Sequence, residues 1–257
     1  STMNRADIFV GMANFKTLFA DPIFLGALKN TFVIVIVSVP ITCIFSLWVS
    51  SAIVDLPEWA TSLFRCVFYL PVVTGSVAVT VVWKWMYNNY YGIFNYLGKS
   101  LGILDKNINW LGDERFALGC IILILLTTSV GQPIVLYVSA LGNVDQSLIE
   151  AAQVDGATKL QRIFYIDIPL IMPTVILMLI LAIGQIMGLG YEKAYLMQTG
   201  TNTTVSEIIT TYTYKVGLQG AQYSFATAVG LFNSVVNFVI LVLANFVSKK
   251  TADVSIF

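Results

Sequence analysis

The 257-residue chain is 57% hydrophobic and only 11% charged, with 14 basic and 14 acidic side chains and no histidine. Ordinary soluble domains carry about 25% charged and about 45–50% apolar residues, so this composition, with a mean hydropathy of +0.81, indicates a membrane protein. It excludes intrinsic disorder, which requires low hydrophobicity and high net charge. A net charge of zero offers no basic surface, and we expect no nucleic-acid partner.

The inventory of reactive side chains is poor. The absence of histidine removes the commonest transition-metal ligand and the commonest general base. The three cysteines, Cys43, Cys66 and Cys120, lie in apolar runs, and their spacing fits neither a zinc site nor a disulfide framework. We therefore predict no metal site, no catalytic residue and no cofactor in this chain, and a membrane-embedded enzyme is disfavoured.

Charge-free stretches of about 20 residues can cross a hydrocarbon core of about 30 Å as helices. Five occur, at residues 30–54, 66–83, 116–144, 168–191 and 216–248. We predict an all-α, polytopic membrane bundle of five spans, forming one transmembrane domain over residues 1–257. Five spans place the two ends of the chain on opposite sides of the membrane. Because the chain starts at Ser1 and not at a methionine, we also expect a sixth, N-terminal span before it.

Four of these stretches contain a proline, namely Pro40, Pro71, Pro133 and Pro173. Helix breakers at membrane depth require neighbouring helices or a water-filled cavity to satisfy the freed backbone groups. A simple anchor bundle would not need so many. The loop lysines and arginines do not settle which side is cytoplasmic, because the loops on the more basic side are also much longer.

The loop between the third and fourth spans has a pattern of its own. Residues 144–157, VDQSLIEAAQVDGA, predict a short helix that Asp145 or Ser147 caps and Gly156 ends. Its apolar face is formed by Leu148, Ala151 and Ala152. A second amphipathic piece follows, with an apolar face of Leu160, Ile163 and Phe164 and with Lys159 and Arg162 opposite. Pro169 then opens the next span, where its missing N–H costs little.

Two interpretations of this loop are open. It is either an interfacial helix lying on the bilayer or an element that inserts into a cleft of another protein. The small side chains of Ala151 and Ala152 make a poor membrane anchor and suit close insertion. In that case Glu150 would meet an arginine or lysine of the partner.

The same residues match a family motif: Glu-Ala-Ala, a glycine four residues later, and Ile-x-Leu-Pro ten residues further on. The matching positions are Glu150, Ala151, Ala152, Gly156, Ile166, Ile168 and Pro169, with Ile168 replacing leucine. The chain resembles the permease subunits of type I ATP-binding-cassette importers, which share this motif. Residues 9–32 are similar to the segment after the first helix in the carbohydrate-uptake branch, and residues 190–218 look most like permeases for oligosaccharides.

The resemblance implies a mechanism and a set of partners. Residues 145–168 would form a cytoplasmic coupling loop, in which the residues that contact an ATPase are Glu150, Ala151, Ala152, Asp155, Gly156, Ile166, Ile168 and Pro169. It implies a second, different permease, two cytoplasmic ATPase subunits that bind ATP and Mg, and an extracellular solute-binding protein. It places the chain in the bacterial cell membrane, among lipid, with residues 1–29 outside and the C-terminus cytoplasmic. The substrate would be a carbohydrate; an amino acid, polyol or anion is the alternative.

The sequence features that bear on the energy source of transport are consistent with this resemblance. The chain has no G-x-x-x-x-G-K-[ST] phosphate loop, so ATP would have to bind another subunit. No predicted span has an aspartate or glutamate at mid-depth, where ion-driven transporters usually carry ionisable groups. An ion-driven transporter is therefore the less favoured alternative.

A carbohydrate pathway needs amide, hydroxyl and aromatic partners and few formal charges. The candidates inside spans are Gln132, Tyr137, Gln185, Asn233 and Asn237. The alternative is that they join helices through hydrogen bonds. We expect Gly184, Gly188 and Gly190 to provide close helix packing. The loop at 88–100, NNYYGIFNYLGKS, is either a docking surface for the binding protein or an interfacial aromatic belt.

Overall fold

A computed structural model describes residues 9–184 and 190–252. These residues form helices and loops and contain no strand, which confirms the all-α prediction. Four helical segments within them are long and apolar enough to cross a membrane: Pro22–Ile53, Glu114–Leu141, Lys159–Gly184 and Tyr223–Lys250. A bent pair, Glu58–Val73 with Ser76–Met86, makes a fifth if it counts as one span. The predicted number of spans agrees with this arrangement.

The spans are built from the following elements. Helix α1 (Ala13–Ala20) precedes the first span, α2 (Pro22–Ile53). The bent pair is α3 (Glu58–Val73) with α4 (Ser76–Met86), and the next span joins α6 (Glu114–Ser129) to α7 (Gly131–Leu141). The fourth consists of α9 (Lys159–Arg162), the π-helical turn η1 (Ile163–Asp167) and α10 (Ile168–Gly184). The last is α14 (Tyr223–Ala252).

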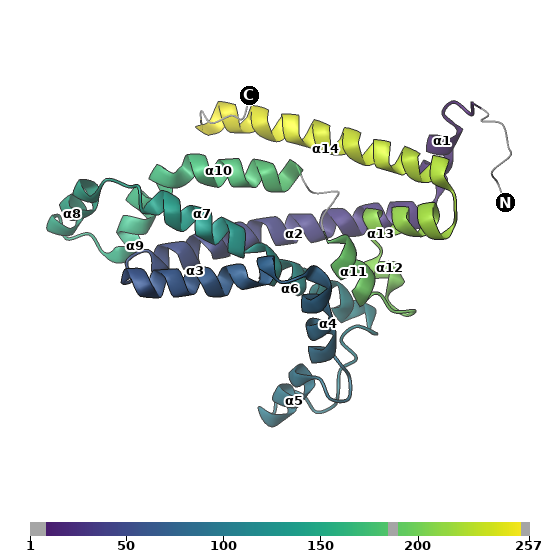
Figure 1. Ribbon diagram of the computed structural model, residues 1–257, viewed down its shortest axis with the longest axis horizontal. Helices are drawn as coiled ribbons and strands as arrows, with labels where there is room; N and C mark the ends of the chain where they lie inside the picture. Colours follow the sequence, from purple (N-terminus) through teal and green to yellow (C-terminus); the bar gives the residue numbers. More distant parts are fainter. Residues whose placement is uncertain (1–8, 185–189, 253–257) are drawn as a thin grey trace.

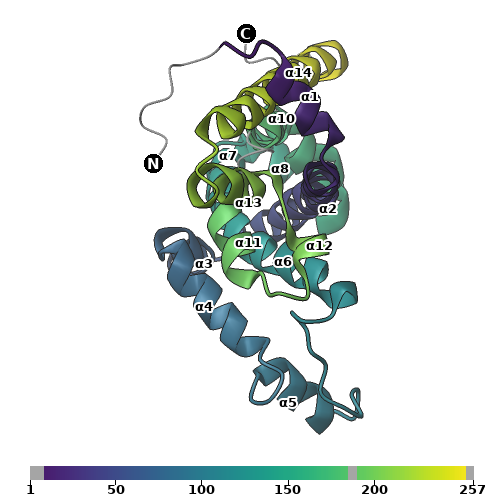
Figure 2. The ribbon, with the colours of Figure 1, turned by 90° about the vertical axis from the view of Figure 1, so that its right-hand side faces the viewer.

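Shorter helices connect them. They are α5 (Ile93–Ser100), α8 (Gln146–Val154), α11 (Tyr191–Met197), α12 (Thr203–Ser206), α13 (Ile209–Tyr214) and the π-helical turn η3 (Lys215–Gln219). The long helices lie along the longest axis, with α8 at one end and α1, α12 and α13 at the other (Figure 1). The view along that axis shows α4 and α5 standing apart from the bundle (Figure 2).

The predicted span at 66–83 is present as a bent pair of helices whose bounds differ from the prediction. The helix begins earlier, at Glu58, and α4 turns away from α3 by 96°. The break falls at Thr74 and Gly75, whose ψ angles of 132° and 130° are extended. Pro71, which has no N–H to donate, lies just before this break and weakens the last turn of α3. The earlier start also places Arg65, just before the predicted span, inside α3.

Small residues bring the spans close together. The hydroxyls of Ser46 and Ser50 on α2 donate to the carbonyls of Val130 and Ile134, at 3.4 and 3.3 Å. A Cβ added to Gly131 would lie 2.3 Å from the carbonyl oxygen of Phe68, so α3 and α7 meet at a position that only glycine fits. These contacts are typical of membrane bundles, in which packing and polar bonds hold helices together.

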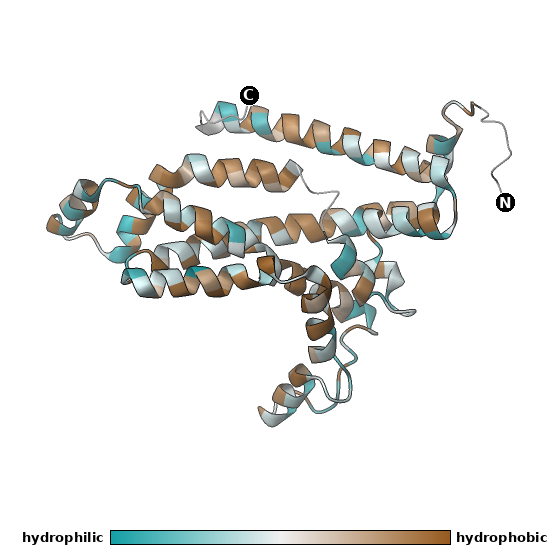
Figure 3. Cartoon of the chain, in the orientation of Figure 1, coloured by the Kyte–Doolittle hydropathy of each residue, from teal (hydrophilic) through white to brown (hydrophobic). Residues whose placement is uncertain are grey.

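The outward faces of the spans are apolar. The long helices are largely hydrophobic, and hydrophilic residues gather on α8, α9 and the loops (Figure 3). On α14, Val235, Phe238, Val242 and Phe246 are all exposed. An exposed apolar stripe of this length is suited to lipid or to a neighbouring membrane helix.

Candidate functional site

The predicted short helix is present as α8, with the predicted ends. Asp145 is its N-cap: the carboxylate accepts from the N–H of Ser147 at 2.9 Å, and this bond lowers the pKa of Asp145. Gly156, with a φ of +76°, follows the helix in the left-handed conformation that favours glycine. The cap is therefore Asp145, one of the two residues that the sequence offered.

The faces of α8 differ from the prediction. Ala152 is buried, but Leu148 and Ala151 point outward and do not share its apolar face. Val154 is 87% exposed, and Glu150 is exposed beside these apolar side chains. Since Ala152 alone of the predicted face turns into the protein, α8 presents a mixed apolar and acidic surface at the end of the molecule (Figure 1).

The chain after α8 turns through a small recess. This recess, of about 330 Å³, is lined by Asp155, Gly156, Ala157, Gln161, Arg162, Tyr165 and Ile166. Three predicted contact residues, Asp155, Gly156 and Ile166, therefore lie around one depression. Ile168 and Pro169 lie beyond it, at the start of α10.

The sequence predicted that Pro169 opens the fourth span, but the helix already contains this residue. The helix starts ten residues earlier, at Lys159, where Thr158 and Gln161 form a capping box. The π-helical turn Ile163–Asp167 comes just before Pro169. A π turn changes the hydrogen-bond register, and such local adjustments let a membrane helix continue through a proline.

A cleft of about 280 Å³ lies between α2, α3, α6, α7 and α10. It is lined by Ser38, Val39, Thr42, Cys43, Val72, Thr128, Ser129, Gln132, Pro133, Tyr137, Met178, Leu179, Leu181 and Ala182. Two predicted pathway residues, Gln132 and Tyr137, are thus brought together in one cleft. The Tyr137 hydroxyl lies 4.0 Å from the Cys43 sulfur.

The sequence missed the hydroxyls of this cleft. Ser38 and Thr42 are one helical turn apart on α2 and flank Pro40, and Thr128 and Ser129 end α6 just before Gly131. Their place beside helix breakers was a usable signal. Combined with Gln132 and Tyr137, they give the cleft hydroxyl, amide and aromatic groups and no formal charge.

The other pathway candidates do not line this cleft. Asn233 and Asn237 lie on α14, and the Oδ1 atom of Asn233 is buried without a hydrogen-bond partner in the described part of the chain. Gln185 lies outside the described residues, as does Gly188. Gly184 packs closely against Leu241 of α14, and Gly190, at a φ of +78°, packs against Leu125, as expected of packing glycines.

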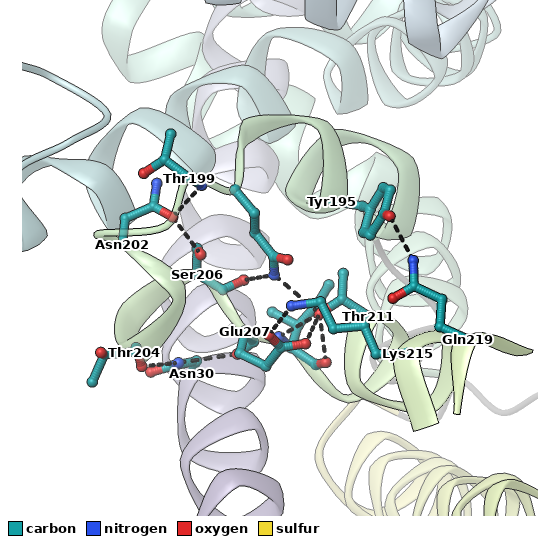
Figure 4. Close-up of polar contacts among 12 residues, drawn as sticks. Asn30, Tyr195, Thr199, Asn202, Thr204, Ser206, Glu207, Thr211, Lys215 and Gln219 are labelled. Atoms are coloured by element: carbon teal, nitrogen blue, oxygen red, sulfur yellow. Dashed lines mark hydrogen bonds and ion pairs between the residues drawn. The ribbon is translucent and has the colours of Figure 1, made fainter. Parts of the chain in front are cut away.

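A network of polar contacts, which the sequence did not predict, joins α2 to the short helices α12 and α13 (Figure 4). The amide of Asn30 on α2 donates to the carbonyls of Thr204 and Glu207, both at 3.0 Å. The buried Glu207 carboxylate accepts from Thr211 at 2.8 Å and pairs with Lys215. These bonds fasten α12 and α13 to the end of α2 that lies away from α8.

The loop at 88–100 forms part of the arm that α4 and α5 build. The Asn95 side chain holds this arm together through hydrogen bonds. Its amide nitrogen donates to the carbonyl of Ile108 at 2.9 Å, and its Oδ1 atom accepts from the Trp110 indole at 3.0 Å. Trp85 and Tyr96 remain exposed on this arm. The arrangement suits both interpretations of the loop, docking surface and aromatic belt.

A bundle of membrane-crossing helices, with an uncharged cleft between five of them and a separate helix exposed at one end, is the architecture expected of a multi-span transport subunit. Residues 22–253 match the family described as binding-protein-dependent transport system inner membrane component. The chain belongs to this family. It is a membrane-spanning transport subunit and not an enzyme.

Two relatives come from Bacillus subtilis (strain 168). The polygalacturonan/rhamnogalacturonan transport system permease protein YteP is 33% identical over 253 residues, which are 97% of this chain and 77% of that protein. Protein LplB is 33% identical over 247 residues, covering 94% and 76% of the two chains. The similarity therefore extends over nearly the whole of this chain.

The fold is also similar to that of a solved importer. A bacterial ABC transporter involved in import of the acidic polysaccharide alginate contains a chain that is 29% identical, with a TM-score of 0.89 over 95% of this chain and 85% of that one. The bacterial alginate transporter bound to its alginate pentasaccharide-loaded periplasmic protein gives the same score and identity. The predicted resemblance to ABC importer permeases is confirmed.

Proposed function

We propose that this chain is a transmembrane subunit of an ATP-driven carbohydrate importer and forms half of its translocation pathway. The observation that carries the proposal is the combination of an uncharged cleft between the spans, lined by apolar, hydroxyl and amide side chains, with α8 exposed at one end. A second, different permease would supply the other half of the pathway.

The proposed substrate is an oligosaccharide. Similar proteins are named for polygalacturonan/rhamnogalacturonan, for lactose and for multiple sugars, and the similar structure is that of an alginate importer. Sugars are recognised by hydroxyl and amide groups and by aromatic faces. Gln132 is exposed and supplies an amide in the cleft, and Tyr137 lines the cleft but is 1% exposed, so the cleft would have to open for it to meet a solute. Gln185, Asn233 and Asn237 are retained as pathway candidates outside its lining.

In the proposed mechanism, two cytoplasmic ATPase subunits bind ATP and Mg, and each grips one coupling helix. In this chain the helix is α8, with Glu150, Ala151, Ala152, Asp155 and Gly156 at the contact. Ile166, Ile168 and Pro169 would join that contact to α10. ATPase closure would move α8 and reorient the spans between discrete states.

The proposed orientation follows from this role. With α8 in the cytoplasm, the end of α14 would be cytoplasmic too, because α2, α7 and α14 all run toward the α8 end (Figure 1). Helices α1, α12 and α13 would face the outside. A solute-loaded binding protein would dock on that side.

A transport assay tests the substrate class. The chain, its partner permease, the ATPases and the binding protein would be reconstituted in lipid vesicles with internal ATP, and uptake of labelled oligosaccharides would be compared with uptake of amino acids, polyols and inorganic anions. We expect uptake of an oligosaccharide alone. Uptake of one of the other solutes that added saccharides do not inhibit would contradict the proposed substrate class.

A further inference from the structure

A partly buried ion cluster lies where the loop that carries α8 meets the turn between α2 and α3. Arg162, the last residue of α9, donates through Nη2 to both carboxylate oxygens of Asp55, at 2.8 and 2.7 Å. Its Nε atom donates to Asp167 at 3.2 Å. Only 10% of the Arg162 side chain and 3% of the Asp167 side chain are exposed. Lys159 adds a more exposed contact to Asp55 at 3.0 Å.

The cluster joins parts of the chain that are far apart in sequence. Asp55 follows the end of α2 and precedes α3, 107 positions before Arg162, whereas Asp167 ends η1 and leads into α10. Two cations balance two carboxylates. The Asp55 side chain is 36% exposed, but the Arg162 guanidinium that it binds is buried. Separating the two would leave a buried cation with one of its two carboxylate partners, which is unfavourable, so the contact resists separation of the α2–α3 turn from α9.

The connection from α8 to this cluster is short and fully hydrogen-bonded. At the end of α8, the N–H groups of Asp155, Gly156 and Ala157 donate to carbonyls of the helix. At the start of α9, the N–H of Thr158 donates to the Gln161 side chain at 2.8 Å. Because both ends of the turn are fixed in this way, a displacement of α8 is passed to α9.

Three of the five helices that line the cleft, α2, α3 and α10, lead away from this cluster. Ser38 and Thr42 belong to α2, Val72 to α3 and Met178 to α10. The chain itself connects α9 to α10 through η1, but α2 and α3 are reached from α9 through Asp55.

We propose that Arg162 is a positioning residue of the transport cycle: through Asp55 and Asp167 it makes the α8–α9 loop, α2, α3 and α10 move together when α8 is displaced. This inference rests on the proposed function, in which an ATPase displaces α8. The residue acts on the cleft through other residues and does not touch the solute.

The test compares uptake with ATP hydrolysis in the same vesicles, using the complete transporter. In Arg162→Gln and Asp55→Asn, we expect the transporter to assemble and to hydrolyse ATP in response to the loaded binding protein. Uptake should fall about tenfold, because breaking an element that couples two sites reduces coupling by roughly that factor. The ATP used per solute therefore rises. Arg162→Lys, which keeps the charge, should recover part of the uptake.

Lys159→Gln is the matched control, since it removes the more exposed cation that binds Asp55 and leaves both contacts of Arg162. It should keep the wild-type ratio of ATP to solute. If Arg162→Gln does not assemble, Asp55→Asn, which keeps Arg162 paired with Asp167, decides the test. An unchanged ratio, or a parallel loss of uptake, hydrolysis and assembly in every variant, would overturn the inference. Failure of the wild-type transporter to use ATP would instead overturn the proposed function.

Discussion

Glu150 is an exposed carboxylate on a helix that is anchored on its other side by Ala152. In the proposed complex it meets a cation of the ATPase, so a reversal of its charge should repel the partner. We expect Glu150→Arg to insert in the membrane normally, to lose transport and to bind the ATPase more weakly. Co-purification of the ATPase with the membrane complex measures this.

The control for that variant is Glu114→Arg, the same change on an exposed residue at the start of α6, at the other end of the span from α8. It should co-purify with the ATPase as the wild type does. Normal recovery of the ATPase with Glu150→Arg would show that α8 is not the docking element.

At this scale, sequence reasoning works where a local pattern decides the structure. The Asp145 cap and the left-handed Gly156 follow from residues within one turn of each other, and the motif spacing identified α8. The inward orientation of Ala152 and the outward one of Leu148 depend on how α8 rests on the bundle, and local periodicity does not contain that information.

At the scale of elements, the contact between α3 and α7 depends on one glycine. A Cβ at Gly131 would lie 2.3 Å from the Phe68 carbonyl oxygen, a backbone atom that cannot move aside without shifting α3. We expect Gly131→Ala to destabilise the protein by about 1–3 kcal/mol, as overpacking does. Thermal unfolding in detergent measures the change.

Gly119→Ala on α6 is the matched control, because a Cβ at Gly119 would meet nothing within 4 Å. It should leave the melting temperature equal or slightly higher, since alanine favours helix more than glycine does. Equal melting temperatures for the two alanine variants would contradict the close approach of α3 to α7.

The ion cluster at the α2–α3 turn should make the stability of the fold depend on pH. Burial alone would raise the pKa of Asp55, but the bonds from Arg162 and Lys159 outweigh it and hold that pKa below its usual 3.8. A lowered pKa in the folded state means that Asp55 stabilises the fold fully above about pH 4 and loses this contribution as the pH falls through the folded-state pKa. The neighbouring Asp167 faces the same arginine.

We therefore expect Asp55→Asn to unfold at a lower temperature than the wild type at pH 7, with the gap closing as the pH is lowered below 4. Melting curves of the two proteins across this range provide the measurement. A gap that is independent of pH would show that the Asp55 charge contributes nothing.

The elements were predictable in number but not in course. Hydropathy identified the spans. The 96° bend at Thr74 and Gly75 and the π turn before Pro169 lie close to prolines, which lack a backbone N–H. How the helix adjusts to that missing donor depends on the helices packed around it. The contact of Asp55 with Arg162 joins positions 107 residues apart. A local sequence pattern does not show which distant residues meet in the folded chain, so this contact was not predictable.

At the scale of the whole molecule, composition was the strongest guide. The low charge and high hydropathy predicted a membrane protein, and membership of the binding-protein-dependent transport family agrees with that prediction. The cleft was only partly predictable: Gln132 and Tyr137 stood out as polar residues in apolar runs. Ser38 and Thr42 did not, because serine and threonine are common in membrane spans, and only their position on either side of Pro40 sets them apart.

The central claim is that α8 transmits energy from a separate ATPase to the transport of a saccharide. The most direct measurement is saccharide uptake by vesicles that contain this chain and its partner permease, with the loaded binding protein outside and with the ATPase and ATP supplied or withheld. We predict uptake against a gradient only when both are present, and none with Glu150→Arg. Uptake driven by an ion gradient in the absence of ATPase and ATP would contradict the account.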